Sequence, residues 1–199
     1  GDDDPVVYED VSGDPFAEYV RDDGMKAKAR YRFEAQKKKT KTPSDSFETL
    51  YNIIDAWQTV DDEVFDARMA ALIDPYGWAA YPAINRVVGN ADSYGWTIFH
   101  NMFFYASPTH RSRLHLHDMD QAYDTNHWNN PDPPLFPQFL LPMILTRLFN
   151  DRPLFRRAYW RVLKNLSEGP LRPEVHVPEL LGWYDALFTN GIAAAHPQP

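Results

Sequence analysis

The stretch of sequence that decides the fold is Gly89-Asn90-Ala91-Asp92-Ser93-Tyr94, followed by His100-Asn101 and by Leu114-His115-Leu116-His117-Asp118-Met119-Asp120. It places single acids and an amide at the ends of two segments that have the alternating pattern of β-strands. Carboxylate and amide oxygens are the ligands that hard divalent cations prefer, especially where phosphate supplies further oxygens. The stretch therefore indicates a site for a metal ion and a phosphate group.

The composition bounds the class of protein. A chain of 199 residues with 44% hydrophobic and 15% aromatic residues can bury one sizeable core. A net charge of -8 disfavours non-specific binding to nucleic acid or to an acidic membrane. No cysteine is present, which excludes disulfides and thiolate chemistry and leaves the compartment open. No segment approaches the roughly 20 apolar residues of a membrane-spanning helix, and no signal peptide is visible.

Hydrophobic periodicity predicts helices and strands around this block. A helix from Asp74-Pro75 ends at Gly89, because glycine suits the left-handed conformation that closes a helix. Residues 97–105 and 113–117 are predicted as a β-hairpin with the acids at its far end.

The other elements are predicted as a strand at 6–11, a helix start at 14–16, a strand and a basic loop within 24–46, a loop at 124–134, and helices at 46–57, 61–72, 135–149, 153–166 and 174–188. Aromatic and leucine side chains recur at helical spacing in the last three helices, which predicts that they face the core. The chain is therefore predicted to belong to the α+β class.

Asp92 has two interpretations on spacing alone. An acid in a turn after a helix can orient a hydroxyl or accept its proton. The same acid can form an Asx-turn or an N-cap with Ser93 and Tyr94. Spacing by itself favours the second interpretation.

Asp118 and Asp120 form a D-x-D pair, and their side chains share a face if the strand continues through them. Paired carboxylates suit Mg²⁺, Mn²⁺ or Ca²⁺, although an isolated D-x-D is more often a capped turn. Asn101 is able to add a neutral oxygen ligand, and amides in hairpins also commonly bond the backbone.

The histidines suggest a second kind of metal site. His115 and His117 share a strand face, with His100 and His110 nearby in sequence. Zinc requires three or four convergent ligands, and the chain has neither an H-E-x-x-H motif nor cysteines. Exposed or hydrogen-bonded histidines are therefore favoured.

In this order, the motifs resemble those of the CotH kinase family, the atypical protein kinases first known from spore coats. Family members carry a segment like G-N-x-D-S-Y, then H-N-Y-Y-L-Y, then a strand that ends in W-D-x-D. The corresponding residues here are 89–94, 100–105 and 117–120. Upstream, residues 7–11 resemble the family's Y-x-x-V-E-x-V strand, and residues 24–29 resemble its G-N-L-Y-K-A.

The resemblance implies an atypical protein-kinase-like fold. Residues 46–199 would form a mostly helical C-lobe whose β-hairpin carries the catalytic block. Residues 1–45 would form a partial N-lobe and hinge segment with a basic loop. The resemblance also implies that further N-terminal strands, with basic residues for the nucleotide phosphates, precede residue 1.

The resemblance assigns roles residue by residue. Asp92 resembles the catalytic-loop aspartate, and Asp118 resembles the metal-binding aspartate of the D-F-G type. Asn101 is the candidate second metal ligand, with Asp120 beside it. The 26 residues between the two aspartates (118 − 92) are close to what the family's hairpin requires.

The implied cofactors are ATP and Mg²⁺ or Mn²⁺, with Ca²⁺ as a further alternative. Glu9 and Lys28 are the candidate residues on the nucleotide side. The implied partner is a protein that offers Ser or Thr hydroxyls, with no nucleic acid, and the implied location is extracellular or at the cell surface. Oligomeric state is left open.

The sequence departs from the family at several positions. His117 replaces the usual Trp, and Met25-Lys26 replace part of the hinge-like motif. A non-catalytic interaction module that keeps the fold is therefore a second hypothesis. A third is a D-x-D metal-dependent glycosyltransferase, which is ranked last because no N-terminal βαβ nucleotide-sugar domain is visible.

Overall fold

A computed structural model describes residues 6–10, 13–39, 47–96, 99, 101–106, 109–123 and 144–191, with the backbone alone for 6–10 and 36–39. Contacts divide the chain into two units, Gly1–Tyr159 and Trp160–Pro199. The mixture of helices with an antiparallel sheet confirms the predicted α+β class. The predicted lobe boundary at residue 45 lies outside the described residues, so it stays a prediction.

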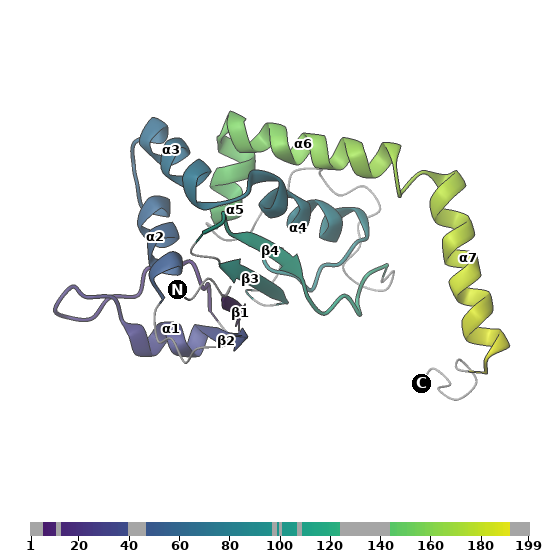
Figure 1. Cartoon of the computed structure of the whole chain (residues 1–199), viewed down its shortest axis with the longest axis horizontal. Helices are drawn as coiled ribbons and strands as arrows, with labels where there is room; N and C mark the ends of the chain where they lie inside the picture. Colours follow the sequence, from purple (N-terminus) through teal and green to yellow (C-terminus); the bar gives the residue numbers. More distant parts are fainter. Residues whose placement is uncertain are drawn as a thin grey trace. The chain divides into compact units, whose positions relative to one another are not determined.

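The sheet has four strands in the order β2-β1-β3-β4 (Figure 1). They are β1 (Val6–Asp10), β2 (Ala35–Lys39), β3 (Met102–Ala106) and β4 (Arg113–Leu116), and every pairing is antiparallel. The predicted hairpin is confirmed as β3 and β4. Since β1 pairs with both β2 and β3, the N-terminal segment and the hairpin share one sheet.

The segment from 24 to 46 differs from the prediction, because it contains a helix as well as a strand. Helix α1 (Lys28–Glu34) runs directly into β2. Tyr31 and Glu34 of this helix are fully buried. Their three-residue spacing is a helical one, which explains why the segment does not form an extended strand.

Three helices lie between the N-terminal strands and the hairpin. They are α2 (Glu48–Trp57), α3 (Asp62–Leu72) and α4 (Pro75–Val87), close to the predicted bounds. Asp61 begins α3 by accepting a hydrogen bond from the Val64 amide at 2.9 Å, and Asp74 begins α4 in the same way from the Tyr76 amide at 3.1 Å. Gly89 has the predicted left-handed backbone, with φ +65°.

The core between α4 and the sheet is aromatic. The Phe16 ring lies 5.2 Å from that of Trp78, 5.5 Å from that of Phe104 and 5.9 Å from that of Tyr94. The predicted helix start at residues 14–16 is instead a turn, in which Asp14 accepts a hydrogen bond from the Phe16 amide at 2.9 Å. This turn places Phe16 in the core, and that tertiary contact outweighs the local helix signal.

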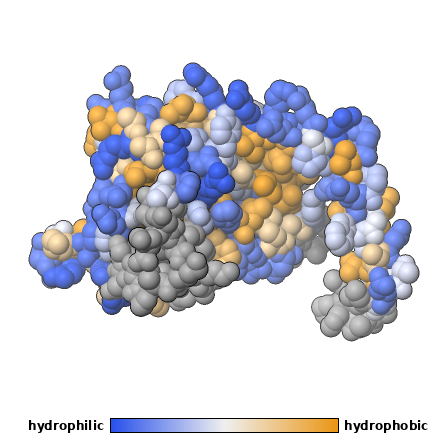
Figure 2. Space-filling model, in the orientation of Figure 1, coloured by the Kyte–Doolittle hydropathy of each residue, from blue (hydrophilic) through white to orange (hydrophobic). Residues whose placement is uncertain are grey.

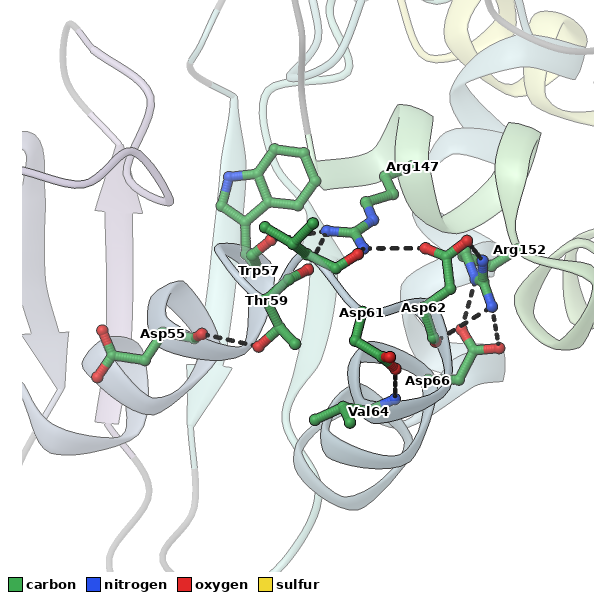
Figure 3. Close-up of polar contacts among 10 residues, drawn as sticks. Asp55, Trp57, Thr59, Asp61, Asp62, Val64, Asp66, Arg147 and Arg152 are labelled. Atoms are coloured by element: carbon green, nitrogen blue, oxygen red, sulfur yellow. Dashed lines mark hydrogen bonds and ion pairs between the residues drawn. The ribbon is translucent and has the colours of Figure 1, made fainter.

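The helix predicted at 135–149 falls mostly outside the described residues. From residue 144 the structure has a short helix, α5 (Ile144–Thr146), and a π-helical turn, η1 (Arg147–Asp151). Figure 3 shows two arginines from this region: Arg147 reaches the α2–α3 connection, and Arg152 reaches the first turns of α3. We call Arg147, Arg152 and their acidic partners Asp62 and Asp66 the arginine clamp.

In the arginine clamp, Arg147 donates to the carbonyl oxygens of Trp57 at 3.1 Å and Thr59 at 2.7 Å, and to Asp62 at 3.1 Å. Its guanidinium carbon also lies 3.8 Å from the centre of the Phe65 ring. Arg152 binds both carboxylate oxygens of Asp66, at 2.8 Å each, and Asp62. The clamp thereby fixes η1 against the start of α3.

The last two helices are α6 (Pro153–Glu168) and α7 (Pro173–Thr189), as predicted. Phe155 and Tyr159 of α6 are buried. Helix α7 has no buried residue, and Trp183 is 72% exposed, so the prediction that its aromatic residues form core is wrong. Its apolar side chains are visible as orange patches among hydrophilic ones in Figure 2. No helix in the described ranges is long and apolar enough to cross a membrane.

Candidate functional site

The turn after α4 holds the residues of the central motif in fixed positions. Asn90 is fully buried, and its side-chain amide donates to the side-chain oxygen of Asn85 at 2.9 Å. The Ser93 hydroxyl donates to the Asn90 carbonyl oxygen at 3.0 Å. Asp92 lies between these anchored neighbours and is only half-buried. The turn therefore presents its carboxylate rather than enclosing it.

Asp92 is hydrogen-bonded by two side-chain amides, one from the start of β3 and one from the loop after β4. Asn101 donates to Asp92 Oδ2 at 3.0 Å and to the Asp92 carbonyl oxygen at 2.9 Å. Gln121 donates to the same Oδ2 at 3.2 Å. The Asx-turn or N-cap that spacing favoured is not what the structure shows. Tertiary donors, not the neighbouring backbone, hold this carboxylate.

Asn101 reaches Asp92 because its backbone is left-handed, with φ +65°. Asparagine tolerates this conformation better than most residues with a side chain. The residue directly precedes β3, so the strand starts with its amide directed at the turn after α4. The structure thus brings together Asp92 and Asn101, two of the predicted site residues.

The Tyr81 hydroxyl joins the elements that carry the site. It is almost fully buried, accepts a hydrogen bond from the Tyr94 amide at 3.0 Å and donates to the Asn101 carbonyl oxygen at 2.9 Å. The Tyr94 hydroxyl in turn donates to Asp14 at 3.0 Å. Burial raises the pKa of the Asp14 carboxyl. A buried hydroxyl that both donates and accepts fixes the relative positions of α4, the turn and β3.

The loop after β4 carries the D-x-D pair. Strand β4 ends at Leu116, and Asp118 has a left-handed backbone with φ +50°, so the strand does not continue through Asp120. The expectation that both carboxylates share one strand face is therefore not met. Both are exposed.

This loop is tied back to the end of α4. The Tyr123 amide donates to the Val88 carbonyl oxygen at 2.7 Å, and the Asn90 side-chain amide contacts the Met119 sulfur at 3.3 Å. Gln121, which holds Asp92, belongs to the same loop. The acids of the D-x-D pair are therefore carried on a segment anchored to the Asp92 turn.

The chemistry of the donors fits a hard cation. Asp118 and Asp120 offer exposed carboxylate oxygens, and Asn101 offers an amide, which suits Mg²⁺ or Mn²⁺. In the ranges that the structure describes, no three His, Asp or Glu side chains are grouped so that they could hold a metal ion. Asp118, Asp120 and Asn101 therefore stay candidate metal ligands, and this role stays a prediction.

The histidines pack against aromatic rings. The His117 ring lies 4.2 Å from that of Phe103, and the His115 ring lies 5.9 Å from that of Tyr105. Both imidazole rings are therefore in contact with an aromatic side chain of β3. His100 lies outside the described residues.

The two predicted nucleotide-side residues lie on the N-terminal elements. Glu9 is in β1, where its backbone is opposite Phe103 of β3, and its side chain is outside the description. Lys28 is the first residue of α1 and is exposed. Their roles stay predictions.

Sequence reasoning missed Gln121 and Tyr81. Gln121 directly follows the D-x-D pair, and an amide beside two acids was a usable signal for it. Tyr81 was readable only as an inward-facing residue of its helix, because the partners of its hydroxyl come from the turn and from β3.

The sequence was compared with known proteins and protein families. No curated protein matches the chain at a significant level. The sequence profile of the family described as CotH kinase protein matches residues 11–188, which include α1 to α4, the Asp92 turn, the hairpin and nearly all of α7. Because the match covers most of the chain, this protein belongs to the CotH kinase family.

Proposed function

We propose that this protein is an atypical protein kinase that transfers the γ-phosphoryl group of ATP to Ser or Thr hydroxyls of a protein. The family membership supports a kinase-like protein. The observation that carries the finer proposal is the Asp92 carboxylate, which is half-buried and held by the amides of Asn101 and Gln121.

Asp92 is suited to accept a proton from an attacking hydroxyl. Both amide donors bind Oδ2. No group in the described ranges donates to Oδ1, so this oxygen is available to a substrate hydroxyl. In the proposed step the hydroxyl proton moves to Asp92, the substrate oxygen bonds to the γ-phosphorus, and the bond from that phosphorus to the ADP oxygen breaks. Positioning by the two amides keeps the carboxylate oriented throughout.

Asp118, with Asp120 and Asn101, would hold Mg²⁺ or Mn²⁺, with Ca²⁺ the less favoured alternative. A bound cation would neutralise charge on the phosphate oxygens of ATP. Glu9 and Lys28 are proposed on the nucleotide side. Action on an extracellular or cell-surface protein is part of the same proposal.

The test is transfer of labelled γ-phosphate by the full-length protein with Mg²⁺ or Mn²⁺, comparing the wild type with Asp118→Ala. We expect the variant to lose nearly all activity while keeping its melting temperature. Asp22→Ala, at an exposed turn position, is the matched control and should transfer normally. Equal activity in Asp118→Ala would remove the proposed metal role.

A non-catalytic interaction module is the second candidate. Asp118 and Asp120 are exposed, and no three acids or imidazoles of the described ranges are grouped to hold a metal ion, which favours this candidate. It predicts no thermal shift of the full-length protein with ATP and metal, whereas a kinase should be stabilised. The glycosyltransferase hypothesis gains no support, since all strand pairings in the described sheet are antiparallel.

A further inference from the structure

A basic cavity lies at the turn end of the β3–β4 hairpin, away from Asp92. Its volume is about 600 Å³. Its lining, in the described part of the chain, consists of Asp74, Tyr105, His110, Arg111, Arg113 and His115. Two arginines against one aspartate give this cavity a net positive charge, although the chain as a whole carries a net charge of -8.

The strand pattern aligns the basic side chains. Residues 111, 113 and 115 are exposed, whereas Ser112 and Leu114 between them are buried. Side chains two residues apart on a strand point to the same face, at intervals of roughly 6.7 Å. Tyr105 is directly opposite Arg113 on β3, and its ring contacts that of His115. Tyr105, Arg113 and His115 of the cavity lining therefore share one face of the hairpin, and Arg111 lies two residues before Arg113.

Arg113 is held in place by α4. Its Nε donates to Asp74 Oδ2 at 2.8 Å, while Asp74 Oδ1 caps α4. A Cβ at Gly77 would lie only 2.9 Å from Arg113 Cγ, so the glycine makes room for the arginine stem. No described group accepts from the two Nη atoms of Arg113, and no described group is hydrogen-bonded to the Arg111 side chain. Both guanidinium groups therefore keep donors for a ligand.

We propose that this cavity binds a phosphomonoester dianion carried on a protein segment, that is, a phosphoserine or phosphothreonine. Two guanidinium groups with unused, paired N–H donors match the several acceptor oxygens and the double charge of such a group. Asp74 does not oppose this binding strongly, because Arg113 and the first turn of α4 already offset its charge.

A second cavity indicates a polypeptide ligand rather than a free phosphate. It has a volume of about 270 Å³ and shares His110 and Arg111 with the first cavity. Its other lining residues, Thr49, Asn52, Ala71, Leu72 and Thr109, come largely from α2 and α3. These residues carry no charge, and they combine polar side chains with the apolar Ala71 and Leu72, so they suit uncharged residues that flank a phosphorylated side chain.

The choice of a protein segment, unlike the anion site itself, rests on the proposed kinase function as well as on the second cavity. A kinase of Ser or Thr meets protein chains that already carry its product group. The cavity would then retain a substrate that was phosphorylated once and present further hydroxyls to Asp92. Asn101, which directly precedes β3, and Tyr105 within it are four residues apart, which separates the two sites by roughly 13 Å along the chain.

The test measures binding alone, without ATP or metal. A fluorescent peptide with one phosphoserine among neutral residues is titrated with the full-length protein, and the same peptide with serine is the reference. We expect the phosphopeptide to bind at least about tenfold more tightly. Arg111→Gln and Arg113→Gln should each weaken phosphopeptide binding by about tenfold, and Gly77→Ala should weaken it through displacement of Arg113.

Arg21→Gln is the matched control, since Arg21 is an exposed arginine outside both cavities, and it should bind as the wild type does. The melting temperature of each variant is measured as well, and an unchanged value shows that weaker binding does not come from unfolding. Because Arg111 is exposed and pairs with no described group, Arg111→Gln tests the site even if Gly77→Ala is unstable.

Equal binding of the two peptides, or full affinity in Arg111→Gln and Arg113→Gln, would overturn the proposal. Inorganic phosphate or ATP that competes as well as the phosphopeptide would overturn the assignment to a protein segment. Asp92→Asn should bind the phosphopeptide normally. A failure of this site is thus separable from a failure of the kinase proposal, which the Asp118→Ala transfer assay tests.

Discussion

The Asp92 site and the arginine clamp are both polar clusters, and they differ in how completely the protein satisfies them. In the clamp, Arg147 and Arg152 direct their donors at carbonyl and carboxylate oxygens of residues 57–66 (Figure 3). In the Asp92 site, amides hold one carboxylate oxygen, and Asp118 and Asp120 stay exposed. A cluster satisfied within the protein stabilises the fold, whereas one with exposed carboxylates is suited to a ligand.

Replacement of Asp92 should have the largest effect and should affect chemistry alone. Asp92→Asn keeps the shape and removes the group that accepts the proton, so we expect kcat to fall by about 10²- to 10⁴-fold. The measurement is the initial rate of labelled γ-phosphate transfer, with the melting temperature measured alongside. A variant that keeps most of its rate would exclude Asp92 as the base.

Replacement of Arg147 should lower the stability of the fold, in contrast to replacement of Asp92, which should lower the catalytic rate. Arg147→Met keeps much of the side-chain packing but removes the donors for Trp57, Thr59 and Asp62, and we expect a loss of about 2–3 kcal/mol in the free energy of unfolding. Urea unfolding measures it. Arg21→Met, at an exposed ion pair with Asp23, should cost less than about 1 kcal/mol. Equal losses in the two variants would contradict a special role for the clamp.

Gln121 should act as a positioning residue for Asp92. Gln121→Met removes one amide donor to the carboxylate, and we expect kcat to fall by roughly 5- to 10-fold, corresponding to one hydrogen bond. KM for the protein substrate and the melting temperature should change little, which a purely structural role would not predict. A fall in stability with unchanged kcat would assign Gln121 to the fold instead.

The smallest effect concerns the acid stability of the clamp. The hydrogen bond from Arg147, together with the charges of both arginines, lowers the pKa of Asp62 below its ordinary 3.8. The stabilisation from Asp62 is therefore complete above pH 3.8 and is lost as the pH falls through the lowered pKa. Asp62→Asn should show a shallower loss of stability on acidification below about pH 4.

Urea midpoints followed against pH measure this difference. Because the Asp62 side chain is 59% exposed, added salt should reduce the difference between the wild type and Asp62→Asn. Arg147→Met should also make the fall of the urea midpoint below about pH 4 less steep. An Asp62→Asn curve parallel to that of the wild type would contradict the proposed coupling.

The features that were predictable from sequence are those that depend on near neighbours. The helix starts near Asp61 and Asp74, the left-handed Gly89 and the alternation along β4 each follow from residues within a few positions. The order of the CotH-like motifs also located Asp92 and Asn101, which the structure brings together.

The predictions that failed depend on distant contacts. The turn at Asp14 was predicted as a helix start, and only the packing of Phe16 against Trp78 explains it. The aromatic residues of α7 have helical spacing, yet they are exposed. The prediction failed because helical spacing alone does not show whether another surface covers the apolar face.

The sequence by itself therefore determined the family, most helices and strands, and the acid at the centre of the candidate site. Only the tertiary structure decided which donors hold that acid and which arginine is kept in place at the other end of the hairpin. Gln121 meets Asp92, and Asp74 meets Arg113, across long separations in sequence, and Asn101 meets Asp92 across nine residues through its left-handed backbone. Such contacts arise from the packing of α4 against the hairpin, which no local pattern encodes.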